Sequence, residues 1–252
     1  MKKSLKIRNI FGENLDLLLE GSEESKDVVI FVHGYGTDKD EGFASFLEFS
    51  EYLEDEFLII RFDLSGYGAS EGKDMDFQFQ KAAGDVDSVI RYARRTWPDK
   101  NINIIAHSLG TFVVGLLSPH NIKRTVFTSV PNANMRYVSE TLQQRILDKG
   151  GRVDKNGITV YPRTAGATQL IGKDFWRTLE NSDPIQLIEE LGQKTKLVIY
   201  KPKQDEVLEY KYFEDYKNLK NAKYIEIDGD HNFKDPKDRQ ILFDEIRNFL
   251  RG

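Results

Sequence analysis

The sequence contains no cysteine, and this absence excludes several kinds of chemistry. Disulfide bonds, a cysteine nucleophile and thiolate-bound metals all need the missing side chain. No apolar run approaches the ~18 residues that a membrane-spanning helix requires. The first residues lack the apolar core of a signal peptide, because charges continue through Lys6 and Arg8. We therefore expect a cytoplasmic protein with no membrane partner.

The charge balance gives no reason to expect a polyanionic partner. The net charge of −5 argues against nucleic acid as a ligand. The stretch 210–220 mixes lysines with aromatic residues, but acidic residues interrupt it, which predicts an amphipathic surface helix. Glycine spacing typical of dinucleotide or phosphate loops is missing, as is metal-ligand spacing. The sequence therefore predicts neither a cofactor nor a metal.

Short apolar runs alternate with helical patterns along most of the chain. Two earlier segments, 5–10 and 15–20, are more polar and predict edge strands. Six further runs are mostly apolar, which is typical of strands that are buried on both faces of a parallel sheet. Together these segments predict eight strands. The six apolar runs are 28–33, 57–63, 102–107, 125–130, 196–201 and 223–228.

Apolar residues recur every three or four positions between the strands. Phe79, Ala83, Val86, Ile90 and Ala93 predict an amphipathic helix that ends before the next proline. A second apolar pattern over 241–250 predicts a C-terminal helix, with a proline near its start. Alternating strands and helices indicate an α/β fold with helices on both faces of the sheet.

The stretch between the fourth and fifth apolar runs departs from this alternation of strands and helices. It spans about sixty residues, too many for one crossover helix. It contains helix patterns over 139–148 and 183–191 and a hairpin signal at Asn156-Gly157. We interpret it as a cap over the carboxyl edge of the sheet. The expected division is a core of 1–131 and 192–252 with a cap insertion of 132–191.

The pentapeptide AHSLG at 106–110 lies between a strand and a helical run. A nucleophilic serine in this setting occupies a tight strand–turn–helix elbow, and small residues two positions away let the strand and helix approach. Ala106 and Gly110 satisfy that requirement around Ser108. The alternative interpretation is an ordinary serine at a helix N-terminus.

The loop HGYG at 33–36 follows the first apolar strand. Acyl transfer needs N–H donors aimed at the developing oxyanion. The backbone N–H groups of Tyr35 and Leu109 are the candidates, since the first is held in a glycine-rich loop and the second opens a helix. His33 is expected to support this loop.

Only four histidines are present, so the general base can be sought by elimination. His107 adjoins the serine and should point away from it, and His120 follows a helix end at the surface. His231 lies in the turn DGDHNF after the last strand, at the edge where sites of open α/β sheets form. We expect His231 to be the base. The alternative is a surface turn histidine.

The acid that orients the base should come from a neighbouring loop. The loop after the fourth apolar strand has no carboxylate before Glu140. The loop PKQDEVL after the fifth offers Asp205 and Glu206. Asp205 suits the distance better, and Glu206 is the alternative.

With these pieces in place, the chain resembles the α/β-hydrolase superfamily, and within it bacterial carboxylesterases of the cinnamoyl (feruloyl) esterase-like group. The matching segments are 9–15, 28–36, 61–72, 106–110, the Asp205 loop, 228–233 and 171–191. The chain departs from that group at Thr111, where a second glycine is common. It also departs at Tyr200-Lys201-Pro202, where a His-Gly pair is usual.

The resemblance implies an α/β-hydrolase fold: a mostly parallel eight-stranded sheet with a cap insertion after strand 6. It implies Ser108, Asp205 and His231 as the triad and Tyr35 and Leu109 as the oxyanion hole. It also implies that Asp63, Gly66 and Gly68 shape a structural loop near the site.

The expected function is a cofactor-free serine carboxylesterase acting on a small-molecule ester with a short acyl or aryl group. The alternatives are a thioesterase, monoacylglycerol lipase, peptidase or acyltransferase on the same triad, or a non-catalytic binding protein. The cap balances acidic against basic residues, so no charged entrance is expected. The sequence leaves the oligomeric state open, a homodimer included.

Overall fold

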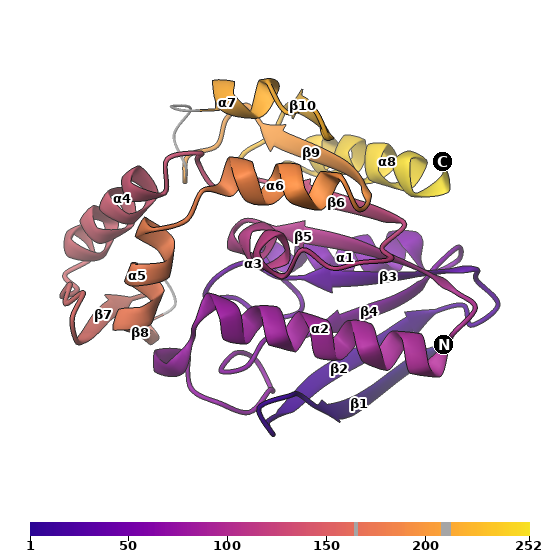
Figure 1. Ribbon diagram of the computed structural model, residues 1–252, viewed down its shortest axis with the longest axis horizontal. Coiled ribbons are helices and arrows are strands. Elements are labelled where there is room, and N and C mark those ends of the chain that lie inside the picture. The colour runs from indigo at the N-terminus through magenta and orange to yellow at the C-terminus, as the bar shows by residue number, and fades with distance from the viewer. Residues whose placement is uncertain (164–165, 208–212) are drawn as a thin grey trace.

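The computed structural model describes residues 1–163, 166–207 and 213–252. In this part of the chain, eight strands form one sheet and two others, β7 and β8, form a hairpin. The sheet order is β1-β2-β4-β3-β5-β6-β9-β10 (Figure 1). The bounds of its strands are Lys2–Arg8, Asn14–Gly21, Asp27–Val32, Leu58–Phe62, Asn101–His107, Arg124–Thr128, Lys196–Pro202 and Ala222–Ile227 for β1 to β6, β9 and β10.

The sheet is mostly parallel, as the sequence predicts. Only β1 with β2 and β2 with β4 are antiparallel, and the remaining neighbours run parallel. The expectation that 15–20 forms an edge strand is wrong, because β2 lies between β1 and β4. Its buried Leu15, Leu17 and Leu19 alternate with half-buried residues. The alternation therefore reflects a partly exposed face of the strand and not a position at the edge of the sheet.

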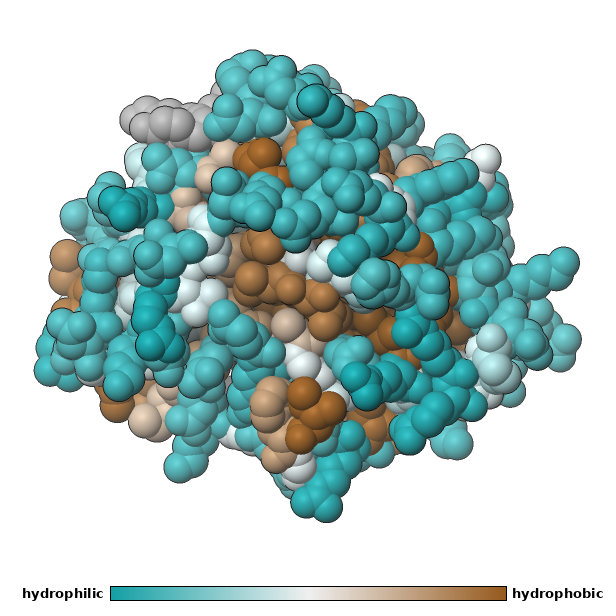
Figure 2. All heavy atoms as spheres, in the orientation of Figure 1, coloured by the Kyte–Doolittle hydropathy of each residue, from teal (hydrophilic) through white to brown (hydrophobic). Residues whose placement is uncertain are grey.

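Helices cover both faces of the sheet because its strands are apolar on both sides. In β3, Val28, Ile30 and Val32 pack in one hydrophobic cluster, and Val29 and Phe31 pack in the other. The first cluster lies under α2 (Phe79–Thr96), α3 (Leu109–Leu117) and α6 (Pro184–Gly192). The second lies under α1 (Ser45–Leu53) and α8 (Pro236–Arg251). Figure 2 shows hydrophobic atoms gathered near α3, with hydrophilic residues around them.

Helix starts follow the capping residues that the sequence offers. The Asp183 carboxylate accepts hydrogen bonds from the N–H groups of Ile185 and Gln186 at the start of α6. The Asp235 side chain caps α8 in the same way, with Pro236 as the first helical residue. Both predicted helices are therefore confirmed.

The insert between β6 and β9 contains α4 (Met135–Asp148), β7 (Ile158–Pro162), β8 (Thr168–Gly172), α5 (Lys173–Glu180) and α6, the last of which packs on the sheet. Figure 1 shows α4, α5 and the hairpin grouped beyond one end of the sheet. The Asn156-Gly157 hairpin is realised only as a single bridge between Arg152 and Val160. The main partner of β7 is β8, because their buried side chains share one face, Tyr161 opposite Gln169.

The expected helix over 210–220 falls partly outside the described residues. Within them, α7 spans Glu214–Lys217. None of the helices in the described ranges is both long and apolar enough to cross a bilayer. The division into core and cap remains a prediction. Phe175 and Trp176 of the cap pack in the same hydrophobic cluster as the sheet.

Candidate active site

Ser108 occupies a strained turn between β5 and α3. Its backbone has φ 51° and ψ −129°, a conformation that non-glycine residues rarely adopt. The Ser108 N–H donates to the Thr128 carbonyl at 3.0 Å. A Cβ on Gly110 would lie 2.5 Å from the His33 carbonyl oxygen, so only glycine allows α3 to approach β3 this closely. This crossing holds the serine at the carboxyl edge of the sheet.

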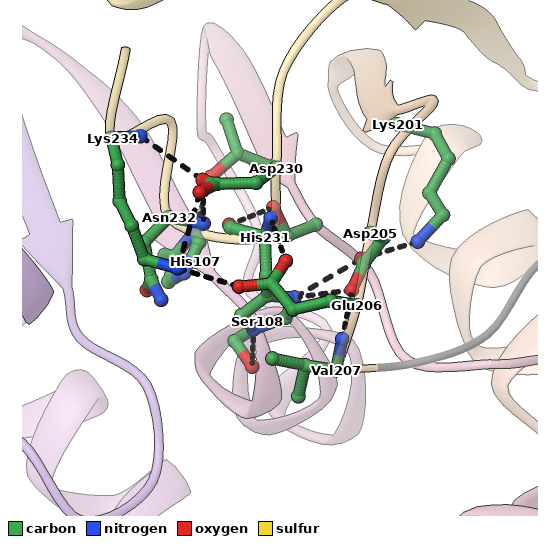
Figure 3. A network of polar contacts seen from close by, with 12 residues as sticks. His107, Ser108, Lys201, Asp205, Glu206, Val207, Asp230, His231, Asn232 and Lys234 are labelled. Carbon is green, nitrogen blue, oxygen red and sulfur yellow. Dashed lines mark hydrogen bonds and ion pairs between the residues drawn. The ribbon is translucent and has the colours of Figure 1, made fainter.

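The structure brings Ser108, His231 and Asp205 into one hydrogen-bonded chain (Figure 3). His231 Nε2 lies 3.0 Å from Ser108 Oγ, and His231 Nδ1 lies 3.0 Å from each Asp205 oxygen. The three residues come from the ends of different parallel strands, β5, β9 and β10. This geometry suits proton transfer from the serine to the imidazole, while the carboxylate stabilises the imidazolium.

Glu206 lies beside this chain but contacts the His231 backbone instead of its ring. Its Oε2 accepts the His231 N–H at 3.0 Å, and its Oε1 pairs with Lys234 Nζ at 2.6 Å. Ser129 Oγ donates to the His231 carbonyl at 2.7 Å. Glu206 and Ser129 thus fix the histidine loop, and Asp205 is the carboxylate that faces the imidazole.

Lys201 is a functional candidate that the sequence reasoning treated only as a departure from the esterase group. Its side chain is fully buried, pairs with the Asp205 carboxylate and stands 4.0 Å over the Phe213 ring. Burial lowers the pKa of Lys201, although the Asp205 charge opposes this effect. Burial acts to raise the pKa of Asp205, but His231 and Lys201 outweigh it and hold that pKa well below its usual range.

The other histidines lie where the elimination places them. Leu64 N–H donates to His33 Nε2 at 3.0 Å, so the proton sits on Nδ1, which contacts the Gly34 carbonyl at 2.8 Å. His107 Nδ1 contacts Thr128 Oγ1 at 2.9 Å, and burial lowers the pKa of His107 to about 3. His120 is exposed. None of the three contacts Ser108 Oγ in the described ranges.

Two backbone N–H groups beside the serine are available to a ligand. Leu109 is the first residue of α3, and Tyr35 belongs to the loop that abuts Ser108. A Cβ at Gly34 would lie only 3.2 Å from Ser108 Cβ. Within residues 1–163, 166–207 and 213–252, neither the Tyr35 nor the Leu109 N–H donates an internal hydrogen bond. These are the two groups expected to bind an oxyanion.

The Asp63 side chain ties the loop after β4 to the loop after β3. The buried Asp63 carboxylate accepts hydrogen bonds from the N–H groups of Lys39 and Ala69 at 2.7 and 2.8 Å. A Cβ on Gly68 would lie 2.2 Å from Asp63 Oδ2, so a side chain at this position would clash with the Asp63 carboxylate. The loop therefore has the structural character that the resemblance implies.

A cavity of about 560 Å³ opens above Ser108 and reaches under the cap. Its floor includes Ser108, Leu109 and His231, and its cap wall includes Leu142 and Tyr161. Phe175 and Trp176 are instead fully buried in the cap core. A cavity of this size suits a small molecule.

The strand order, the serine elbow and the insert after β6 together define the α/β-hydrolase fold. A family model described as "alpha/beta hydrolase fold" matches residues 27–147. The resemblance to this superfamily is thereby confirmed. No sequence among the curated proteins matches the chain.

Several solved structures of esterases share this fold. Est1E of Butyrivibrio proteoclasticus with ferulic acid bound is 18% identical, with a TM-score of 0.75, over 98% of this chain and 97% of that one. An esterase of Pyrococcus furiosus is 16% identical, with a TM-score of 0.75, over 100% and 90%. The esterase domain of a Rhodothermus marinus protein is 17% identical, with a TM-score of 0.73, over 100% and 98%. These likenesses establish the fold.

Proposed function

We propose that this protein is a serine carboxylesterase that hydrolyses small acyl or aryl esters. The observation that carries the proposal is the hydrogen-bonded chain from Asp205 through His231 to Ser108 Oγ on the cavity floor. The Tyr35 and Leu109 N–H groups beside the serine, which donate no internal hydrogen bond within the described residues, support it. The esterase neighbours add weight by analogy only, since their identity to this chain is low.

The reaction follows from these positions. Ser108 Oγ attacks the ester carbonyl while His231 Nε2 takes its proton, and the Tyr35 and Leu109 amides bind the oxyanion. As the intermediate collapses, the carbonyl–alkoxy bond breaks and His231 protonates the leaving alcohol. Water then attacks the acyl-enzyme with His231 as base, which releases the acid and restores Ser108. Asp205 stabilises the imidazolium in both halves.

The size of the acyl group that reacts tests this proposal. We expect kcat/KM to be highest for acyl groups of about two to eight carbons or of hydroxycinnamate type, because the cap closes the cavity above the serine. The measurement is hydrolysis of 4-nitrophenyl esters from acetate to palmitate, with methyl ferulate alongside. A maximum at palmitate would show a lipid-sized channel and contradict the proposed substrate class.

The pH dependence should follow a single ionisation. Since the pKa of Asp205 is held low and that of His107 is about 3, both keep their charge state above mildly acidic pH. Only neutral imidazole can take the serine proton, so kcat/KM should rise with pH and then level off. A profile that is flat from about pH 5 to pH 8 would contradict His231 as the base.

Replacing Lys201 should move that rise. Lys201→Met removes a positive charge beside Asp205, which leaves the carboxylate freer to stabilise the imidazolium. The rise in kcat/KM should therefore shift to higher pH by about one unit. Lys203→Met is the control, because Lys203 pairs with Asp228 at the surface. An unchanged profile in Lys201→Met would mean that the buried ammonium only supports packing.

A further inference from the structure

Three of the eight basic residues of the insert 132–191 line the active-site cavity. Arg145 in α4, Lys149 just after it and Arg163 just after β7 all line the cavity wall that faces the catalytic serine. The acidic residues of the insert lie elsewhere, so charges that balance by count do not balance in space. The expectation of an uncharged entrance therefore does not hold at the cavity.

Arg163 contacts the loop 33–36, which carries the Tyr35 N–H group. Its Nη2 donates to the Gly36 carbonyl at 3.2 Å, next to Tyr35. A Cβ on Gly36 would lie 2.9 Å from the Arg163 Cζ, so the glycine makes room for the guanidinium. The guanidinium also stands 4.9 Å from the centre of the Tyr161 ring, which Lys149 faces at 5.5 Å. Aromatic packing thus positions two cations along one wall.

The guanidinium groups retain capacity for an anion. Arg145 donates to the Val207 carbonyl at 2.7 Å, and each guanidinium has five N–H donors. Within the described ranges, neither Arg145 nor Arg163 forms an ion pair with a carboxylate. Both side chains are half-buried, where pairing with an anion gains more than at a fully exposed site.

The carboxylates that also line the cavity are already engaged. Glu41 is buried and accepts hydrogen bonds from the Gly34 and Gly42 N–H groups. Its burial raises the pKa of the Glu41 carboxyl, which favours the neutral form. Glu206 pairs with Lys234 and holds the His231 N–H. Neither one neutralises the basic wall.

We propose that the preferred substrates are esters that carry a carboxylate away from the scissile bond, and that Arg163, with Arg145 and Lys149, binds this carboxylate. A guanidinium matches a carboxylate through two parallel N–H bonds, which would fix the substrate over Ser108. The inference rests on the proposed esterase function and narrows its substrate class to half-esters of dicarboxylic acids and esters of carboxylated alcohols or phenols.

Matched pairs of esters test the proposal. One pair carries the charge on the acyl side: mono-4-nitrophenyl glutarate and its isosteric amide, 4-nitrophenyl 4-carbamoylbutanoate. The other carries it on the alcohol side: 4-carboxyphenyl and 4-carbamoylphenyl butyrate. With each rate normalised to alkaline hydrolysis, we expect at least one acid to exceed its amide in kcat/KM by about tenfold or more at low salt. The preference should shrink as salt is added.

Variants assign that preference to the basic wall. Arg163→Gln should abolish or strongly reduce the ratio of kcat/KM for the acid to kcat/KM for its amide, whatever the change in the amide rate itself. Arg177→Gln makes the same change on α5, at a side chain that is 75% exposed and outside the cavity, and should keep the preference. The triple variant with Arg145→Gln and Lys149→Gln extends the test to the whole wall. Loss of the preference in either cavity variant supports the proposal.

Failure of this inference and failure of the esterase proposal give different results. The amide esters alone test esterase activity. Binding is read without turnover in Ser108→Ala, where the acid of the pair that shows the preference should raise the melting temperature more than its amide does. Equal rates within both pairs, a preference insensitive to salt, or a preference that survives the triple variant would overturn the role of the basic wall. Equal effects of the two ligands on melting would also overturn it.

Discussion

Replacing Ser108 with alanine should lower ester hydrolysis by about 10⁴-fold or more, because the variant has no atom to attack the carbonyl. The measurement is kcat for 4-nitrophenyl butyrate under saturating conditions. The fold should persist, since the strained backbone at this position is set by Gly110 and the Thr128 carbonyl rather than by the hydroxyl.

Ser118→Ala provides a control at the other end of the same helix. Ser118 also has a positive φ, of 44°, and its hydroxyl contacts Lys194 away from the cavity. Its replacement should leave turnover unchanged. If Ser108→Ala kept near-normal turnover with a wild-type melting curve, Ser108 would not be the nucleophile.

Asp205→Asn should lower kcat by about 10³- to 10⁴-fold. An amide facing His231 Nδ1 favours the wrong imidazole tautomer, and it also leaves the buried Lys201 without its carboxylate. Melting temperature is measured with kcat, because loss of that ion pair should also destabilise the fold.

Glu206→Gln is the matched control for the acid. Glutamine keeps an oxygen for the His231 N–H, so the loop should hold and kcat should change little. The two variants differ by one residue in position and remove the same charge. A large loss in Glu206→Gln with little change in Asp205→Asn would reverse the assignment of the acid.

The sheet could be predicted from sequence because its strands are buried on both faces. A continuous apolar run such as 28–33 is typical of a strand in a parallel sheet that is buried on both faces. The same topology explains the site, because the ends of parallel strands meet at one edge. Ser108, Asp205 and His231 each follow such a strand, so their meeting required no knowledge of loop conformation.

Features that depend on particular loop conformations could not be predicted in this way. Helix α1 follows Glu41, Phe43 and Ala44, which all have positive φ values that their residue types do not signal. The pairing of β7 with β8 depended on which face the cap buries rather than on the Asn156-Gly157 turn. Such choices are set by tertiary packing.

The spatial arrangement of charged side chains was the other feature that could not be predicted from the sequence. Lys201 and Asp205 are four residues apart across a strand end, and only the folded loop turns both side chains inward. The basic wall of Arg145, Lys149 and Arg163 likewise arises from a helix end and a strand end that fold together. Counting charges along the sequence could not reveal either arrangement.

The central claim is that Ser108 is an activated nucleophile, and covalent labelling tests it most directly. The protein is treated with a fluorophosphonate, which phosphonylates the serine of working triads, and the product is read by intact mass and peptide mapping. We predict one adduct per chain, located on Ser108 and lost in Ser108→Ala. A folded wild-type protein that takes up no adduct, or takes it up elsewhere, would contradict the account and favour a hydrolase fold used for binding.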